Sequence, residues 1–248
     1  MSGAQITLML PGAFRELTEA IRRAFAEEGK GIELAFHPSA PSGMLAQALL
    51  EGAHADVIVS ANWAFMERLQ EVGLVPAPQV LAGNRLCLVV RPDSGSLVTG
   101  ADSLAQPGLR VVVTQPITDP CGQYVRELFA RAGIVAAMQE KARRGELMHA
   151  RGSADVPAYL ADGRAEAGIL YVSEAQRLVD RLQVIPLPQP LDLSDRIRFT
   201  IGAVASGGRP KPEAERFVDF STGDAGQSVL EAAGFLPRAT LVDGGCHG

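Results

Sequence analysis

The chain has 248 residues, of which 47% are hydrophobic and 21% charged, and its formal net charge is −5. This is enough chain to bury a full core in one large domain or in two smaller ones. The negative balance argues against a nucleic-acid-binding protein and against a protein that binds an anionic membrane surface. No segment approaches the roughly 20 apolar residues that a membrane span needs.

The cysteines and histidines do not form a recognisable metal or disulfide pattern. The three cysteines are widely spaced without a CxxC pair, and the four histidines show no HxH or HExxH pair. We therefore expect no disulfide framework, no metal centre and no cofactor. The cysteines are Cys87, Cys121 and Cys246.

The first part of the chain alternates strands with amphipathic helices. Strands are predicted at Ile6–Leu10, Ile32–Phe36 and Val57–Ser60, where short apolar runs occur. The helix between the first two strands has Phe14, Leu17, Ile21, Ala24 and Phe25 on one face, with Gly29 as its C-terminal cap. The next helix carries Met44, Leu45, Ala48 and Leu49 on one side. This β-α-β-α-β order predicts a parallel sheet with covering helices.

A second set of elements follows in the middle of the chain, and the last elements return after a proline-rich segment. Crossovers near residues 80–84 and 188–198 favour two α/β lobes: residues 1–82 with 192–248 as lobe I, and 83–191 as lobe II. The predicted strands are Arg85–Val90, Leu109–Val113, Ala167–Tyr171, Leu182–Ile185 and Phe199–Val204, and the predicted helices follow Gly122, cover Val156–Ala161, contain Phe217 and Phe220, and end at Gly234.

Four turns between strands and helices are rich in small or hydroxyl residues. They are LPGAF (10–14), PSAPSGM (38–44), TDPCGQY (118–124) and RGSADV (151–156). In open α/β sheets ligands bind beyond the carboxyl ends of the strands, and helix N-termini there favour anions. Helix capping alone would explain any single turn, because serine is a common N-cap residue. Four such turns favour a shared pocket for a small anion.

The chain resembles the periplasmic molybdate/tungstate-binding proteins of ABC importers, a branch of the two-lobed type II solute-binding fold. The resemblance runs nearly end to end. The motifs that carry it are LAQALLEGAHADVIVSAN (45–62), LAGNRLCLVV (81–90), DPCGQYVRELFARAGI (119–134), ADVPAYLADGRAEAGILYVSEA (154–175) and FVDFSTGDAGQSVLEAAGFLP (217–237). It implies an α/β fold of two lobes, each with a mixed, mostly parallel sheet flanked by helices.

The resemblance also implies a site in which neutral groups from both lobes hold a tetrahedral oxyanion. Ser42 matches a hydroxyl donor, Cys121 and Val156 match backbone N–H donors, and Tyr171 matches a phenol donor. The first turn departs from the family, since Ala13 stands where a serine is usual, and the second turn is longer by about three residues, with Pro38, Ser39 and Pro41 added. The predicted ligand-binding set is Gly12, Ala13, Ser42, Gly43, Cys121, Val156 and Tyr171.

The function expected from the resemblance is capture of molybdate or tungstate and its delivery to the membrane permease of an ABC importer. Such a protein is a monomer without catalysis, cofactor or nucleic-acid partner, and its metal enters only within the oxyanion. The family implies a periplasmic location; the start of this chain has no export signal, so a cytoplasmic one stays open. The alternatives are a protein diverged to another anion, such as a carboxylate, and an enzyme that uses Cys121. Arg85 and Arg151 are further candidates for positive charge near the site.

Overall fold

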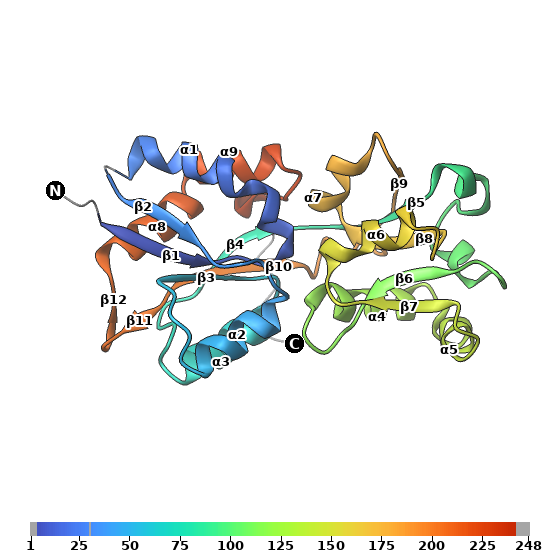
Figure 1. The fold of residues 1–248 in the computed structure, drawn as a ribbon, viewed down its shortest axis with the longest axis horizontal. Coiled ribbons are helices and arrows are strands. Elements are labelled where there is room, and N and C mark those ends of the chain that lie inside the picture. The colour runs from blue at the N-terminus through green and yellow to red at the C-terminus, as the bar shows by residue number, and fades with distance from the viewer. Residues whose placement is uncertain (1–3, 30, 242–248) are drawn as a thin grey trace. The chain divides into compact units, whose positions relative to one another are not determined.

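The computed structural model describes residues 4–29 and 31–241. It contains two compact units, one formed by Met1–Gly83 with Arg198–Gly248 and the other by Asn84–Ile197. Each unit is built on its own five-stranded sheet with helices packed against it (Figure 1). The α/β fold with two lobes that the sequence predicts is confirmed.

The sheet of the first unit has the strand order β2-β1-β3-β10-β4. Strand β1 pairs in parallel with β2 and β3, whereas β10 pairs antiparallel with β3 and β4. Four of the five strands therefore run in one direction, which makes the sheet mixed and mostly parallel. The strands are β1 (Gln5–Met9), β2 (Glu33–Phe36), β3 (Val57–Ser60), β4 (Gln79–Gly83) and β10 (Arg198–Ala203).

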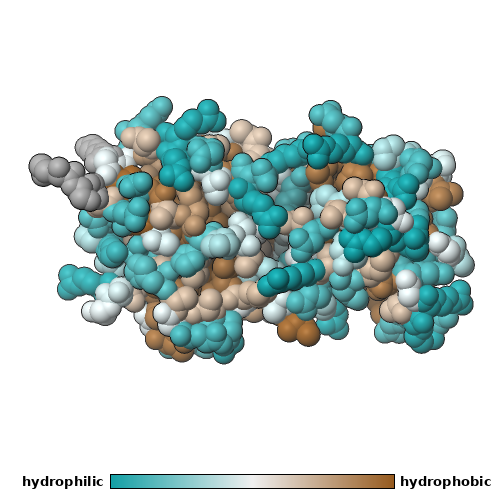
Figure 2. All heavy atoms as spheres, in the orientation of Figure 1, coloured by the Kyte–Doolittle hydropathy of each residue, from teal (hydrophilic) through white to brown (hydrophobic). Residues whose placement is uncertain are grey.

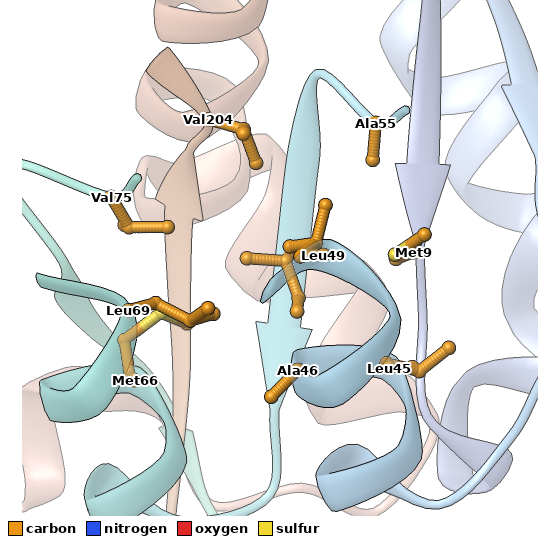
Figure 3. Close-up of a cluster of buried hydrophobic side chains, with 10 residues drawn as sticks. Met9, Leu45, Ala46, Leu49, Ala55, Met66, Leu69, Val75 and Val204 are labelled. Atoms are coloured by element: carbon orange, nitrogen blue, oxygen red, sulfur yellow. The ribbon is translucent and has the colours of Figure 1, made fainter. Parts of the chain in front are cut away.

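The helices of the first unit cover its sheet, and α2 and α3 bury one apolar cluster against it. In this cluster Leu45 and Leu49 of α2 and Leu69 of α3 lie among apolar side chains that include Met9 of β1 (Figure 3). Full burial of each such side chain stabilises the fold by roughly 1.5–3 kcal/mol. The helices and remaining short elements are η1 (Gly12–Leu17), α1 (Thr18–Glu28), α2 (Ser42–Leu50), α3 (Trp63–Glu71), β11 (Ala205–Ser206), β12 (Arg209–Pro210), α8 (Pro212–Thr222), α9 (Asp224–Ala232) and η6 (Arg238–Thr240).

The sheet of the second unit has the strand order β7-β6-β8-β5-β9. Strand β6 pairs in parallel with β7 and β8, and β5 pairs antiparallel with β8 and β9. This repeats the pattern of the first unit. The strands are β5 (Leu86–Val90), β6 (Val111–Thr114), β7 (Leu147–Ala150), β8 (Ala167–Tyr171) and β9 (Gln183–Pro186).

The inner strands of the second unit, β5, β6 and β8, are buried at every residue, so both faces of this sheet are covered. Helix α6 packs on one face, where Val156 and Leu160 join the buried side chains of Val112 and Leu170. The helices of this unit are η2 (Pro92–Leu97), η3 (Ala101–Ala105), α4 (Pro120–Arg131), α5 (Val135–Arg143), η4 (Ser153–Asp155), α6 (Val156–Ala161), α7 (Val172–Ala175) and η5 (Gln176–Leu178).

Some elements differ from the sequence prediction. The helix expected from Phe14 onward is divided, because η1 precedes α1. Its cap is confirmed: the Gly29 N–H donates to the Phe25 oxygen at 2.6 Å. Strand β4 was not predicted; it pairs with β10, and the chain passes from the first unit to the second between Gly83 and Asn84, inside the segment 80–84 that was expected as a crossover. The sequence analysis did not predict strand β7 or helix α5.

The second crossing between the units lies after Ile197. The backbone oxygen of Asp192 accepts a hydrogen bond from the Leu86 N–H at 2.7 Å, and Leu193 is fully buried. This contact holds the segment after the proline-rich run to β5. Cys246 and the last histidine, His247, lie outside the described residues.

Candidate functional site

Every residue of the predicted ligand-binding set ends or follows one of five strands, which are β1 and β2 in the first unit and β6, β7 and β8 in the second. In the first unit β1 lies between β2 and β3, and in the second unit β6 lies between β7 and β8. The chain passes from β1 to β2 on one side of it and then to β3 on the other, and from β6 to β7 and then to β8 in the same way. The carboxyl ends of the three strands meet at one edge, which is where α/β sheets bind ligands.

In the first unit Gly12 and Ala13 open the short helix η1 directly after β1. The N–H of Phe14 donates to the Pro11 oxygen at 2.9 Å and closes this turn. Ala13 is buried and brings no polar side-chain atom. This turn can therefore offer a ligand only its backbone.

Ser42 is the first residue of α2, followed by Gly43, and its side chain is almost completely buried. Its Oγ accepts a hydrogen bond from the N–H of Ala61, just after β3, at 3.0 Å. A hydroxyl that accepts in this way still has its own proton to donate. Ser42 is therefore fixed in place by β3 and is suited to donate to an acceptor at the strand ends.

In the second unit the turn after β6 is organised by Asp119, which the sequence analysis did not single out. Its carboxylate caps α4: Oδ1 accepts the Cys121 N–H at 2.9 Å, and Oδ2 accepts the Ser153 N–H at 3.0 Å. Burial is the main cause that raises the pKa of Asp119 to about 6; the two backbone bonds act to lower it and Asp155 raises it. One carboxylate thus joins the turns after β6 and β7.

The expected backbone donors of this unit already have acceptors within the chain. The N–H of Cys121 donates to Asp119, and the N–H of Val156 donates to the Ser153 oxygen. Ser153 also donates its hydroxyl to Glu174 Oε1 at 2.8 Å, which connects this turn to α7. The roles of Cys121 and Val156 stay predictions, and each requires its N–H to be shared with a ligand or released to it.

Tyr171 ends β8 and is buried, and its ring meets the ring of Tyr124 edge-on at a centroid distance of 6.5 Å. Burial raises the pKa of the Tyr171 phenol well above its usual value, and Cys121 and Asp119 raise it further. The phenol therefore stays protonated at neutral pH. It is a neutral donor, as the resemblance implies, although its ligand role stays a prediction.

Cys121 is fully buried beside the same groups. Burial, Asp119 and Glu174 raise the pKa of its thiol well above the usual value, while a hydrogen bond with Thr114 acts in the opposite direction. A nucleophilic cysteine needs a lowered pKa and access to substrate. The geometry therefore disfavours an enzyme that uses Cys121.

Gly122, next to Cys121, has a packing role. A Cβ at this position would lie 2.5 Å from the Thr114 oxygen and 2.7 Å from the Gln115 carbonyl carbon. Only a residue without a side chain lets α4 begin so close to the end of β6. The glycine after Cys121 is therefore explained by helix packing.

Arg85 and Arg151 are the two further candidates for positive charge near the site. Arg151 is exposed, and the Nε of Arg85 is buried with no hydrogen-bond partner among the described residues. Among residues 4–29 and 31–241, no cluster of three potential metal ligands occurs and no helix is long and apolar enough to cross a membrane.

Comparison with known proteins identifies relatives along most of the chain. It is 28% identical over 227 residues to the molybdate-binding protein ModA of Mycobacterium tuberculosis, covering 91% of this chain and 80% of that protein. The periplasmic molybdate-binding protein of Azotobacter vinelandii has a similar fold, with a TM-score of 0.80 at 18% identity, covering 93% of this chain and 98% of that one. The sulfate-binding protein SubI of M. tuberculosis has a TM-score of 0.77 at 17% identity, covering 96% and 88%.

The resemblance found in the sequence is confirmed by these relatives, and the two solved structures confirm the fold. The model of the family described as bacterial extracellular solute-binding proteins matches residues 6–236. That match covers both units. The chain belongs to the family of bacterial extracellular solute-binding proteins.

Proposed function

We propose that this protein captures a small tetrahedral oxyanion, molybdate or tungstate first, and delivers it to the permease of an ABC importer. The observation that carries the proposal is the similarity, over nine-tenths of the chain, to a protein named for molybdate binding. In this proposal the protein works as a monomer in the periplasm, without catalysis and without a nucleic-acid partner.

The chemistry of the strand ends agrees with an oxyanion ligand. A divalent oxyanion has many acceptor lone pairs and no donor, so it is held well by hydroxyl and N–H donors. Each bond to a charged acceptor contributes roughly 1.5–3 kcal/mol. Ser42 and Tyr171 are neutral, buried donors, one in each unit, and we assign both to the ligand with the backbones of Gly12, Ala13 and Gly43. The backbone N–H groups of Val156 and Cys121 complete the proposed set of donors to the ligand.

A thermal-shift panel tests the ligand. Because the anion binds the folded protein only, a concentration one hundred times its dissociation constant stabilises the fold by about 2.7 kcal/mol. We expect molybdate and tungstate to raise the melting temperature more than sulfate, phosphate or a small carboxylate. A carboxylate that shifts the melting temperature more than either metal oxyanion would contradict the assigned ligand, since the altered first turn would then have changed the specificity.

Replacement of Tyr171 tests the site. Tyr171→Phe removes one donor and keeps the ring, so we expect a loss of roughly 1.5–3 kcal/mol, a ten- to hundredfold weaker affinity by calorimetry. Tyr159→Phe is the matched control, since the Tyr159 hydroxyl makes a long hydrogen bond, 3.4 Å, to the His149 oxygen. Equal affinities of the two variants would show that Tyr171 is a packing residue.

A further inference from the structure

Two backbone donors in the second unit converge on a single carboxylate. The Cys121 N–H, in the first turn of α4, and the Ser153 N–H, in the turn after β7, bind the two oxygens of Asp119 at 2.9 and 3.0 Å. These turns are the ones from which the proposed function draws the donors of this unit. A helix N-terminus and converging N–H groups favour an anion, and here an anionic side chain already occupies them.

We propose that Asp119 makes oxyanion binding at this site depend on pH: its carboxylate competes with the oxyanion for the N–H groups of Cys121 and Ser153, so that binding of the oxyanion is coupled to uptake of one proton by Asp119. The inference rests on the proposed function and deepens it. In the balanced step, free protein, dianion and one proton give a complex in which Asp119 is a neutral carboxylic acid.

The surroundings of Asp119 make the competition strong. The titratable groups that act on it or lie in its hydrogen-bond network are Asp155 of η4, Cys121 of α4, Tyr171 of β8 and Glu174 of α7. Cys121 and Tyr171 are neutral, and the others are acidic. A dianion placed beside an ionised Asp119 therefore adds negative charge to an acidic environment. Arg151, on the turn that carries Ser153, is exposed to solvent, which screens its charge.

Protonation changes what Asp119 offers. As a carboxylate it only accepts hydrogen bonds, and it retains both N–H donors. As a carboxylic acid it binds these donors less strongly and gains one O–H donor of its own. The pKa of Asp119 is raised to about 6, mainly by burial, so the proton is taken up at a modest cost near neutral pH. Above that pH the affinity for a dianion falls by up to tenfold per pH unit, because the complex binds one more proton than the free protein.

Calorimetric titration of tungstate and molybdate at about pH 6.5, 7.5 and 8.5 tests the coupling, in two buffers of different ionisation enthalpy at each pH. For the unmodified chain we expect the dissociation constant to rise by up to tenfold per pH unit, with uptake of nearly one proton at the highest pH. Asp119→Asn and Asp119→Ser should bind without proton uptake, with a constant affinity that exceeds that of the unmodified chain at pH 8.5. Serine keeps an N-cap acceptor for the Cys121 N–H, so it serves if the asparagine variant does not fold.

Asp155→Asn is the matched control, because it removes an exposed acidic group near Asp119 and leaves the pair of N–H bonds in place. It should keep the pH dependence and the proton uptake. Binding by the unmodified chain with constant affinity and no proton uptake overturns the inference and leaves the proposed function standing. Absence of oxyanion binding by the unmodified chain and by both Asp119 variants at every pH overturns the two together.

Discussion

The sequence leaves two roles open for Cys121: a backbone N–H donor to the ligand, or a catalytic residue of an enzyme. Its small side chain is fully buried, and its N–H already binds Asp119. A buried thiol with a raised pKa fills space and neither attacks a substrate nor forms a strong hydrogen bond. The structure therefore favours a packing role for the side chain, whichever ligand is bound.

Substitution of Cys121 separates these roles. We expect Cys121→Ala to change oxyanion affinity by less than about threefold, less than the loss of one neutral hydrogen bond. Cys121→Leu should destabilise the fold by about 1–3 kcal/mol through overpacking and should weaken binding much more than alanine. Urea denaturation and calorimetry measure the two effects. If alanine abolishes binding while the fold is kept, the sulfur itself contacts the ligand.

Only one of the two hydrogen bonds that Asp119 accepts could be predicted from the sequence. Asp before Pro at the start of a helix is an N-cap signal, and the structure has this cap. The second bond, from the Ser153 N–H, joins residues 34 positions apart, and no local pattern predicts it. Burial of the carboxylate follows from that contact, so its raised pKa was not predictable either.

At the scale of elements, helix α4 begins against the end of β6, and Gly122 makes this contact possible. An added methyl group would overlap backbone atoms of Thr114 and Gln115, which cannot rotate away as a side chain can. The helix must shift, and with it the Cys121 N–H and the cap by Asp119.

Gly122→Ala should therefore destabilise the protein by about 1–3 kcal/mol and weaken oxyanion binding as well. Gly100→Ala is the control in the same unit, since a Cβ there meets no atom within 4 Å and the backbone is extended, with φ of 178°. Chemical denaturation measures both variants. Equal stabilities of the two would show that α4 moves away from β6 without cost.

Elements with a strong local signal were predicted well from the sequence. Strands β3 and β8 and helix α6 have the bounds expected, because apolar runs bounded by turn residues leave little choice. Strand β4 was not predicted, because its partner β10 lies more than 100 residues later and no local pattern indicates that pairing. The divided first helix depends on the turn at Pro11, whose 3-10 geometry the apolar spacing does not reveal.

At the scale of the whole molecule, the chain carries a net negative charge. Hydrophilic residues predominate on the face in Figure 2, where apolar residues form separate spots, and the formal net charge is −5. A small dianion is therefore not attracted by the net charge, and its capture depends on local donors. The acidic groups also make the stability of the fold depend on pH, and different groups act in opposite directions.

Asp119 and Asp195 illustrate the two directions. The pKa of Asp195 is lowered by its hydrogen bond and ion pair with Arg131, so its contribution to stability is lost as the pH falls. The pKa of Asp119 is raised from 3.8 to about 6, so between these values the folded state binds more protons than the unfolded state. The stability contributed at this residue is therefore present in acid and lost as the pH rises through about 6.

The difference in unfolding free energy between Asp119→Asn and the unmodified chain isolates this effect, because both chains keep Asp195. In the absence of ligand, we expect this difference to shift in favour of the asparagine variant by about 2 kcal/mol from pH 4 to pH 7. Loss of the hydrogen bond from the Ser153 N–H lowers the stability of the asparagine variant by the same amount at every pH, so it does not change how the difference depends on pH. Urea denaturation at several pH values measures the difference, and a difference that does not change with pH would show that Asp119 titrates as an exposed carboxyl group does.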